Sequence, residues 1–295
     1  MNLIFYYTLS EYLMEKIKYQ DFQNCIQLSN GEVEIVVTID FGPRIIAYNY
    51  VGDENVLGIY TNAKVETALG KFKPYGGHRL WIAPENMPNT YAPDNSPVEY
   101  EFDEQKNSIR LIQPIEIVTQ TQKEITVILD KKGSGVSLNH KIINLGEREI
   151  ELAAWALTIM RGGGEVLIPN EPFVSYGAET LLPVRNLTVW SYTDLSDARW
   201  RFDKEVIRLQ VDKNKSEPQK IGVLNKQGWV KYQLPEVLFV KKFEYLENAV
   251  YPDMNSNTEI YTAGDFIEIE TLAPIERLTP NASIEHTEFW HLSKN

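Results

Sequence analysis

Apolar and polar residues alternate with a period of two along most of the chain, and this pattern predicts β-strands. The turn-forming stretches SNGE, VGDEN, KKGSG, NLGERE, NKQG, TAGD and TPNA separate the alternating segments. Helical patterns are few: residues 9–19 and 60–70 are the best short candidates, and 194–201 is weaker. The predicted strands are 32–39, 44–50, 98–103, 108–118, 124–130, 136–145, 150–160, 187–192, 206–211, 221–225, 229–234, 237–246, 258–263, 266–274 and 283–292.

Many strands joined by tight turns, with almost no helix, indicate an all-β protein built as an antiparallel two-sheet β-sandwich or a barrel. No interval of the sequence repeats cleanly, which disfavours a propeller. No run rich in Pro, Gly and Ser divides the chain, so we predict one domain. Met14, followed by EKIKYQDFQNCIQL, has the character of a chain start. We therefore expect residues 1–13 to form an extension outside the core and residues 14–295 to form the domain.

Composition narrows the classes of partner. The chain has 295 residues, 43% hydrophobic and 24% charged, with a net charge of -12. This balance argues against general nucleic-acid binding and against docking to anionic membranes, since both depend on Lys and Arg. The longest apolar run, LAAWALTIM, is far shorter than the about 20 residues of a membrane span. The first residues lack a basic segment and a clear cleavage site, so we expect a cytoplasmic protein.

Several motifs of common chemistry are absent. The sequence has no phosphate loop, no G-x-S-x-G elbow and no H-E-x-x-H helix. Cys25 is the only cysteine, which excludes internal disulfides and cysteine-rich zinc sites. In EHTEFWHL, strand alternation places His286 and Glu288 on one face and Glu285 and His291 on the other. One such strand offers too few ligands for a metal, so we expect neither a metal nor a cofactor.

The segment 71–94 has the densest set of chemically active side chains. It carries His78, Arg79, Trp81 and Glu85 among two glycines and four prolines, which favours an irregular loop. Functional groups on a loop above a rigid β-scaffold are typical of binding sites. The alternative is a packed crossover with Trp81 in the core, Arg79 paired to a carboxylate and His78 hydrogen-bonded.

The strand FIEIETLAP carries two carboxylates on one face. Alternation places Glu268 and Glu270 together, with Ile267 and Ile269 on the opposite side. Burial and a like-charged neighbour both raise a carboxyl pKa, which suits general acid–base chemistry. The equally weighted alternative is a solvated outer face with the isoleucines inward.

Two further residues stand out. Arg161 follows WALTIM at a predicted strand end, where its guanidinium could bind hydroxyls or carboxylates, or simply lie at the surface. His140 alternates with apolar residues, which favours a hydrogen-bonded core histidine over a catalyst. The 6 Trp and 16 Tyr residues weakly favour a carbohydrate ligand, because aromatic faces stack on sugar rings.

Four motifs together resemble the galactose mutarotase-like (aldose 1-epimerase-like) superfamily, and more narrowly a bacterial family within it. They are GGHRLWIAPENMPNTYAPDN, AAWALTIMRGGG followed by IPN, YPDMNSNTEIYT and FIEIETLAPIERLTPNASIEHTEFWHL. The resemblance spans about residue 20 to the C-terminus and is moderately specific. It implies a large antiparallel two-sheet β-sandwich, a supersandwich, that binds a carbohydrate ligand on a concave sheet face.

The resemblance also implies site residues. Aldose 1-epimerases carry a catalytic Glu in a Leu-Glu-Thr-Gln-like motif, and IETL places Glu270 in that role, as the base acting on the anomeric hydroxyl. Gly76-Gly77-His78 is similar to their early His-Gly-Gly segment, which makes His78 a sugar contact. Their mid-chain general-acid His has no counterpart here, since the comparable strand reads AAWALTIMRGGG.

Two functions remain open. In the first, the protein binds a sugar through Arg79, Trp81, Glu85, Arg161 and Glu268, with weak or no mutarotase activity. In the second, it is an active epimerase of the aldose 1-epimerase type, with Glu270 as base and His78 as acid. The missing histidine favours the first, because general acid assistance is worth about 10²–10⁴-fold. The sequence names neither the sugar nor an oligomeric state.

Overall fold

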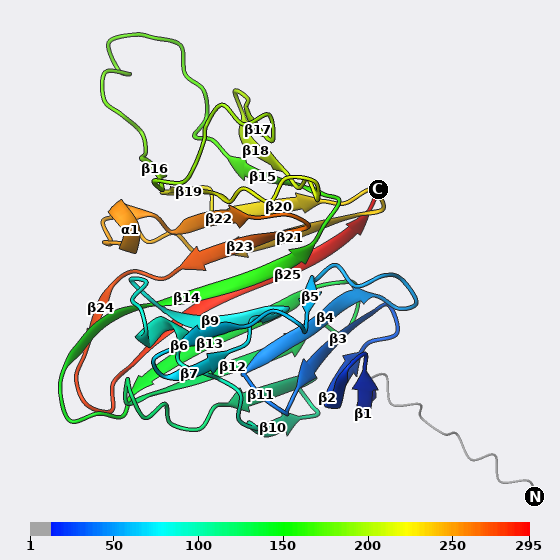
Figure 1. Cartoon of the computed structure of the whole chain (residues 1–295). Coiled ribbons are helices and arrows are strands. Elements are labelled where there is room, and N and C mark those ends of the chain that lie inside the picture. Colours follow the sequence, from blue (N-terminus) through cyan, green and yellow to red (C-terminus); the bar gives the residue numbers. More distant parts are fainter. Residues whose placement is uncertain (1–12) are drawn as a thin grey trace, which may run out of the picture.

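The computed structural model describes residues 13–295, which form two large antiparallel sheets packed face to face (Figure 1). The sheets have 11 and 10 strands, so the predicted all-β antiparallel sandwich is confirmed. Helix is limited, within this range, to η1 (Asn89–Tyr91) and α1 (Pro252–Asn255). None of the described helices is long and apolar enough to cross a membrane.

The first sheet carries strands from both ends of the chain. Its centre is formed by β9, β14 and β23, which come from three distant parts of the sequence. In order across the sheet the strands are β1 (Leu13–Tyr19), β2 (Phe22–Ser29), β3 (Val33–Thr38), β4 (Arg44–Tyr50), β9 (His78–Ala83), β14 (Ile150–Arg161), β23 (Phe266–Leu272), β22 (Thr258–Thr262), β19 (Gln219–Val223) and β16 (Leu187–Val189), with β24 (Glu276–Leu278) paired to β14.

The second sheet is built mostly from hairpins, and the C-terminal strand lies in its middle, between β13 and β21. In order its strands are β10 (Glu99–Asp103), β11 (Ser108–Ile112), β12 (Thr121–Leu129), β13 (Val136–Asn144), β25 (Ser283–Lys294), β21 (Val237–Phe243), β20 (Trp229–Gln233), β15 (Glu165–Pro169), β18 (Val206–Gln210) and β17 (Trp200–Phe202). Two small ribbons lie outside both sheets, β5 (Ile59–Tyr60) with β8 (Tyr75–Gly76) and β6 (Val65–Thr67) with β7 (Gly70–Phe72).

The main core fills the space between the sheets. Period-two alternation brings one face of each strand inward, as in β13, where buried and partly exposed residues alternate along the whole strand. Ile45, Leu138 and Phe239 are among its fully buried members. A second, smaller apolar cluster, which includes Trp81 and Trp155, lies on the other side of the first sheet. Both faces of the central strands are therefore covered.

The strand predictions are confirmed in position, whereas the helix predictions are wrong where the structure describes them. Residues 13–19 form β1, and residues 60–70 contain β6 and the first residue of β7. The segment 194–201 is made of turns and the start of β17. The predicted extension, residues 1–13, lies outside the described residues apart from Leu13, which begins β1.

The segment 71–94 is less irregular than predicted, because its middle forms β9 in the centre of the first sheet. Gly77 permits the entry into this strand: its φ is +71°, and a Cβ there would lie 2.1 Å from the carbonyl oxygen of Ile45. Strand geometry then sends neighbouring side chains to opposite faces. His78 consequently points between the sheets, and Arg79 points to the outer face of the first sheet.

Candidate functional site

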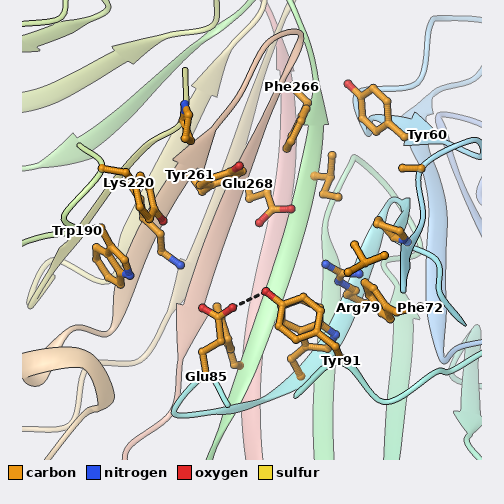
Figure 2. Close-up of a pocket in the computed structure, with 18 residues that line it drawn as sticks. Tyr60, Phe72, Arg79, Glu85, Tyr91, Trp190, Lys220, Tyr261, Phe266 and Glu268 are labelled. Atoms are coloured by element: carbon orange, nitrogen blue, oxygen red, sulfur yellow. Dashed lines mark hydrogen bonds between the residues drawn. The ribbon is translucent and has the colours of Figure 1, made fainter. Parts of the chain in front are cut away.

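A cavity of about 570 Å³ lies on the outer face of the first sheet, the face turned away from the second sheet. This volume is within the range of small-molecule sites. Figure 2 shows side chains converging on it from several segments. The lining residues are Tyr60, Ala63, Val65, Phe72, Pro74, Arg79, Trp81, Glu85, Tyr91, Trp155, Ile159, Trp190, Tyr192, Pro218, Lys220, Tyr261, Phe266 and Glu268.

Strand register explains why distant residues meet at the cavity floor. Lys220 pairs with Tyr261, Tyr261 with Glu268, and Glu268 with Ile159, which forms one row across β19, β22, β23 and β14. The adjacent row on the same face runs through Glu259, Glu270, Leu157 and Arg79. The acidic and basic side chains of these rows are here named the cavity cluster: Arg79, Lys220, Glu259, Glu268 and Glu270.

Arg79 is a buried guanidinium whose hydrogen-bonding groups are incompletely used. The residue is 4% exposed, and its Nε and Nη1 atoms have no hydrogen-bond partner among the described residues. Its guanidinium carbon lies 4.0 Å from the ring centroid of Trp81 and 5.0 Å from that of Phe72. Burial, followed by the charge of Arg44, lowers the pKa of Arg79 to about 10.

Glu268 faces the cavity from β23 (Figure 2). Burial raises its pKa to about 7, the neighbouring Glu270 adds to the rise, and Arg79 and Lys220 oppose it. A carboxyl with a pKa near neutrality can give or take a proton under ordinary conditions.

Lys220 lines the cavity and contacts the carboxylate of Glu270, which lies just beneath the cavity surface. The Glu270 carboxylate is fully buried, and its Oε2 accepts hydrogen bonds from Trp155 Nε1 at 2.9 Å and Lys220 Nζ at 3.0 Å. Lys220 Nζ also lies 2.7 Å from Glu259 Oε2. Burial alone would lower the pKa of Lys220, but Glu270 and Glu259 outweigh it and raise that pKa well above its usual value.

Aromatic rings line the rest of the wall. Trp190 and Tyr192 follow β16, and Lys220 Nζ lies 4.7 Å from the Trp190 ring centroid. Opposite them, the Tyr91 hydroxyl donates a short hydrogen bond to Glu85 (Figure 2). Such rings combine an apolar face with a polar edge, which suits a ligand with both kinds of surface.

His78 is not part of this cavity. It is fully buried between the two sheets, where Nε2 lies 2.6 Å from His140 Nε2 and Nδ1 lies 2.8 Å from Thr158 Oγ1. His140 Nδ1 donates to the carbonyl of His286 at 2.8 Å, so the His140 Nε2 atom accepts from His78. The predicted core role of His140 agrees with this arrangement.

A buried ion pair continues the same network. Glu288 and Lys241 are both fully buried and lie 2.9 Å apart. The Glu288 carboxylate also accepts from Trp290 Nε1 at 2.8 Å and from the Thr271 hydroxyl, and that hydroxyl lies 2.7 Å from His286 Nε2. Here we name this network the interior cluster; its members are His78, His140, Thr158, Lys241, Thr271, His286, Glu288 and Trp290.

The interior cluster has strongly shifted pKa values. Burial lowers the pKa of all three histidines, that of His286 to about 3. Burial alone would raise the pKa of Glu288, but Lys241 and the histidines outweigh it and lower that pKa far below its usual range. The cluster thus holds neutral imidazoles around one carboxylate and one ammonium.

The ligand-forming atoms of His78, His140 and Glu288 lie within 4.8 Å of one another. This spacing is the type that binds a metal. Here a hydrogen bond between the two imidazoles and the Lys241–Glu288 ion pair account for it. The ammonium of Lys241 already balances the Glu288 carboxylate, which disfavours the binding of a metal cation beside it.

The structure therefore gathers most, but not all, of the predicted site residues. Arg79, Trp81, Glu85 and Glu268 line the cavity, and Glu270 lies just beneath it. Arg161 is elsewhere: its guanidinium contacts Glu236 and lies 3.4 Å from Glu54.

Sequence reasoning missed Lys220, Glu259 and Tyr261 as site residues, although two of them have a readable signal. Glu259 and Tyr261 lie in the motif YPDMNSNTEIYT, and alternation in this strand places both on one face. Lys220 alternates with the inward residue Ile221, but its position beside Trp190 depends on the fold of a long connection.

No family model and no curated protein sequence matches the chain. Solved structures do resemble it. A TPR-domain containing protein from Parabacteroides distasonis has a TM-score of 0.61 at 13% identity over 92% of this chain, which spans 47% of that protein. A galactose mutarotase-like protein from Lactobacillus casei has a TM-score of 0.58 at 9% identity, covering 91% of this chain and all 100% of its own.

A proposed mutarotase from Salmonella typhimurium has a TM-score of 0.60 at 13% identity, covering 96% of this chain and 94% of its own. Identities this low show a shared fold. The fold of this protein is that of the galactose mutarotase-like proteins, as the sequence motifs implied.

Proposed function

We propose that this protein binds a monosaccharide in the cavity on the outer face of the first sheet, with weak or no interconversion of its anomers. The observation that carries the proposal is the cavity wall itself. It combines aromatic rings with two polar groups: Arg79, whose Nε and Nη1 atoms have no hydrogen-bond partner among the described residues, and Glu268, whose pKa burial raises to about 7. A sugar offers both surfaces, since its C–H faces stack on rings and its hydroxyls donate and accept hydrogen bonds.

The accessibility of the two predicted catalytic groups supports binding over catalysis. Glu270 is fully buried, and its Oε2 already accepts two hydrogen bonds. His78 lies on the opposite face of the sheet, hydrogen-bonded to His140 and Thr158. A general base or acid must come within hydrogen-bond reach of the proton that it transfers. Neither group reaches the cavity in this arrangement.

Calorimetric titration with a panel of monosaccharides, followed by polarimetric mutarotation assays on each sugar that binds, tests the proposal. Trp190→Ala removes an aromatic wall and should weaken binding about tenfold. Trp229→Ala, on β20 of the second sheet, is the matched control and should bind as the wild type does. Absence of binding across the panel would overturn the proposal, and rapid mutarotation would overturn its second half.

One observation favours anomer interconversion as a second candidate function. Glu268 faces the cavity and has a pKa raised to about 7, chiefly by burial. In this candidate the Glu268 carboxylate takes the proton of the anomeric hydroxyl while a solvent water donates a proton to the ring oxygen as its bond to the anomeric carbon breaks. The hydroxide so formed then takes the proton back from Glu268. Glu268→Gln would then abolish mutarotation. Loss of activity in Glu270→Gln alone would instead assign the base to the residue that the family motif indicates.

A further inference from the structure

Two neighbouring arginines of the first sheet differ in how their charges are satisfied. Arg44 and Arg79 are directly paired across β4 and β9, and both are buried. Arg44 has an ion pair with Asp94 at 2.6 Å and donates to the carbonyl oxygen of Gly76 at 3.0 Å. Arg79 has no ion pair with any described residue, and its Nε and Nη1 atoms are unpartnered. Within the described chain, a carboxylate thus lies in direct contact with the Arg44 guanidinium, and none lies in direct contact with that of Arg79.

The other charged groups at the cavity either have a partner within the chain or can lose their charge by taking up a proton. Lys220 is balanced by Glu259 at 2.7 Å and by Glu270 at 3.0 Å. Glu85 accepts a hydrogen bond from the Tyr91 hydroxyl. Glu268 faces the cavity and can take up a proton near neutral pH. Arg79 is therefore the permanent charge of the cavity wall that has no carboxylate at ion-pair distance among the described residues, although Glu268 and Asp94 raise its pKa from farther away.

The environment of Arg79 suits a flat anion. Its guanidinium lies over the Trp81 ring, 4.0 Å from the centroid, which restricts its plane. A planar guanidinium matches a carboxylate with two parallel hydrogen bonds. A neutral hydroxyl would provide one acceptor and would leave the buried charge uncompensated, which is costly. Trp190 and Tyr192 remain available for the ring of the same ligand.

We propose that the ligand of this cavity is a sugar acid, whose carboxylate pairs with the guanidinium of Arg79 while its hydroxyls reach Glu268. This inference rests on the proposed sugar-binding function and names its substrate class. Arg79 is then the residue that determines specificity for acids over neutral sugars.

The test compares D-glucuronate and D-galacturonate with D-glucose, D-galactose and the methyl ester of galacturonate, by calorimetry at pH 6 and fixed ionic strength. The acids should bind at least about tenfold more tightly than the matched neutral sugars and the ester. Arg79→Met should bring that ratio to about one. Arg161→Met, which removes an arginine outside the cavity, should leave the ratio unchanged.

The outcomes separate this inference from the proposed function. Equal or tighter binding of the neutral sugars overturns the sugar-acid inference and leaves sugar binding standing. Binding of neither class overturns both. A preference for acids that persists in Arg79→Met assigns the carboxylate to another group and overturns the role of Arg79. If Arg79→Met does not fold, the wild-type comparison of galacturonate with its methyl ester still decides the substrate class.

Discussion

The two faces of β9, β14 and β23 each carry a buried polar cluster, and the clusters differ in how completely they are hydrogen-bonded. In the interior cluster every buried side-chain nitrogen and oxygen has a partner within the described chain. In the cavity cluster, the buried Nε and Nη1 atoms of Arg79 and the Oε1 atoms of Glu259 and Glu270 have no hydrogen-bond partner among the described residues. The same strands thus carry a fully hydrogen-bonded network on the inner face, the interior cluster, and an incompletely hydrogen-bonded one on the outer face, the cavity cluster.

This difference indicates which of the two clusters is the better candidate for a ligand site. Unsatisfied buried polar groups cost free energy, so native proteins keep few of them. When such groups gather beside a cavity, a ligand or water that completes their hydrogen bonds offsets that cost. The interior cluster contains the histidines, so residue type alone would suggest a catalytic site there. The cavity cluster, with its incomplete hydrogen bonds, is the better indication of function.

Lys241→Met gives the largest expected effect, because it removes the cation from the interior cluster. The Glu288 carboxylate would be left fully buried without its ammonium partner. Breaking a buried pair in this way costs about 3–5 kcal/mol of unfolding free energy. Chemical denaturation measures this loss. Lys242→Met, on the exposed side of the same strand, is the control and should change stability by less than about 0.5 kcal/mol.

A loss of stability in mild acid is the second expected effect of the interior cluster. Its three histidines have folded pKa values lowered by burial, so the unfolded chain binds more protons below pH 6.5. Their contribution is present above the unfolded pKa and is lost as the pH falls. For a histidine whose folded pKa lies well below 5.5, such as His286 at about 3, this amounts to about 1 kcal/mol between pH 6.5 and pH 5.5.

Denaturation curves at these two pH values measure that loss. His291→Gln, which changes an exposed histidine outside the cluster, should preserve the same dependence. A free energy of unfolding that does not fall over this interval would show that the imidazoles are not held neutral.

The sequence was sufficient for the strand pattern, because alternation reports which face of a strand is buried. It placed Ile267 and Ile269 together on the face opposite the two carboxylates, and both are core residues. It left open whether Glu268 and Glu270 were solvated or sequestered. The answer depends on the segments that cover the outer face, such as those carrying Tyr91 and Trp190, and their paths are long-range properties of the fold.

The same limit explains the misjudged segment 71–94. Its glycines and prolines indicated a loop, whereas pairing with β4 and β14 forms β9 there. That pairing separates His78 from Arg79 by sending them to opposite faces. Lys241 and Lys242 pose an equivalent problem, since no local pattern in VLFVKKFEYL tells which lysine finds a buried carboxylate.

Glu268→Gln tests the cavity cluster, with an effect of opposite sign. Burial raises the folded pKa of Glu268 to about 7, with Glu270 and Glu85 adding to the rise and Arg79 and Lys220 opposing it. The folded protein therefore loses stability as the pH rises from the unfolded pKa of about 4.5 to the folded pKa of about 7, and the loss is complete above that value. Glu268→Gln removes this penalty and should be more stable than the wild type at pH 8, by about 3 kcal/mol. At pH 4, below both pKa values, the two should be about equal, and a variant less stable at both pH values would contradict the assignment.

Arg79→Met has the smallest expected effect on stability, and its comparison with Arg44→Met tests directly whether Arg79 has a structural role. A buried charge that lacks a partner contributes little to the fold, because its desolvation cost is not repaid. Methionine retains the apolar length that packs against Trp81 and Phe72. We therefore expect the free energy of unfolding without ligand to change by less than about 1 kcal/mol. Arg44→Met, its paired neighbour, should be clearly destabilised, since it leaves Asp94 without its partner. If instead Arg79→Met lost as much stability as Arg44→Met, Arg79 would be a structural residue, and the contrast between a complete and an incomplete cluster would fail.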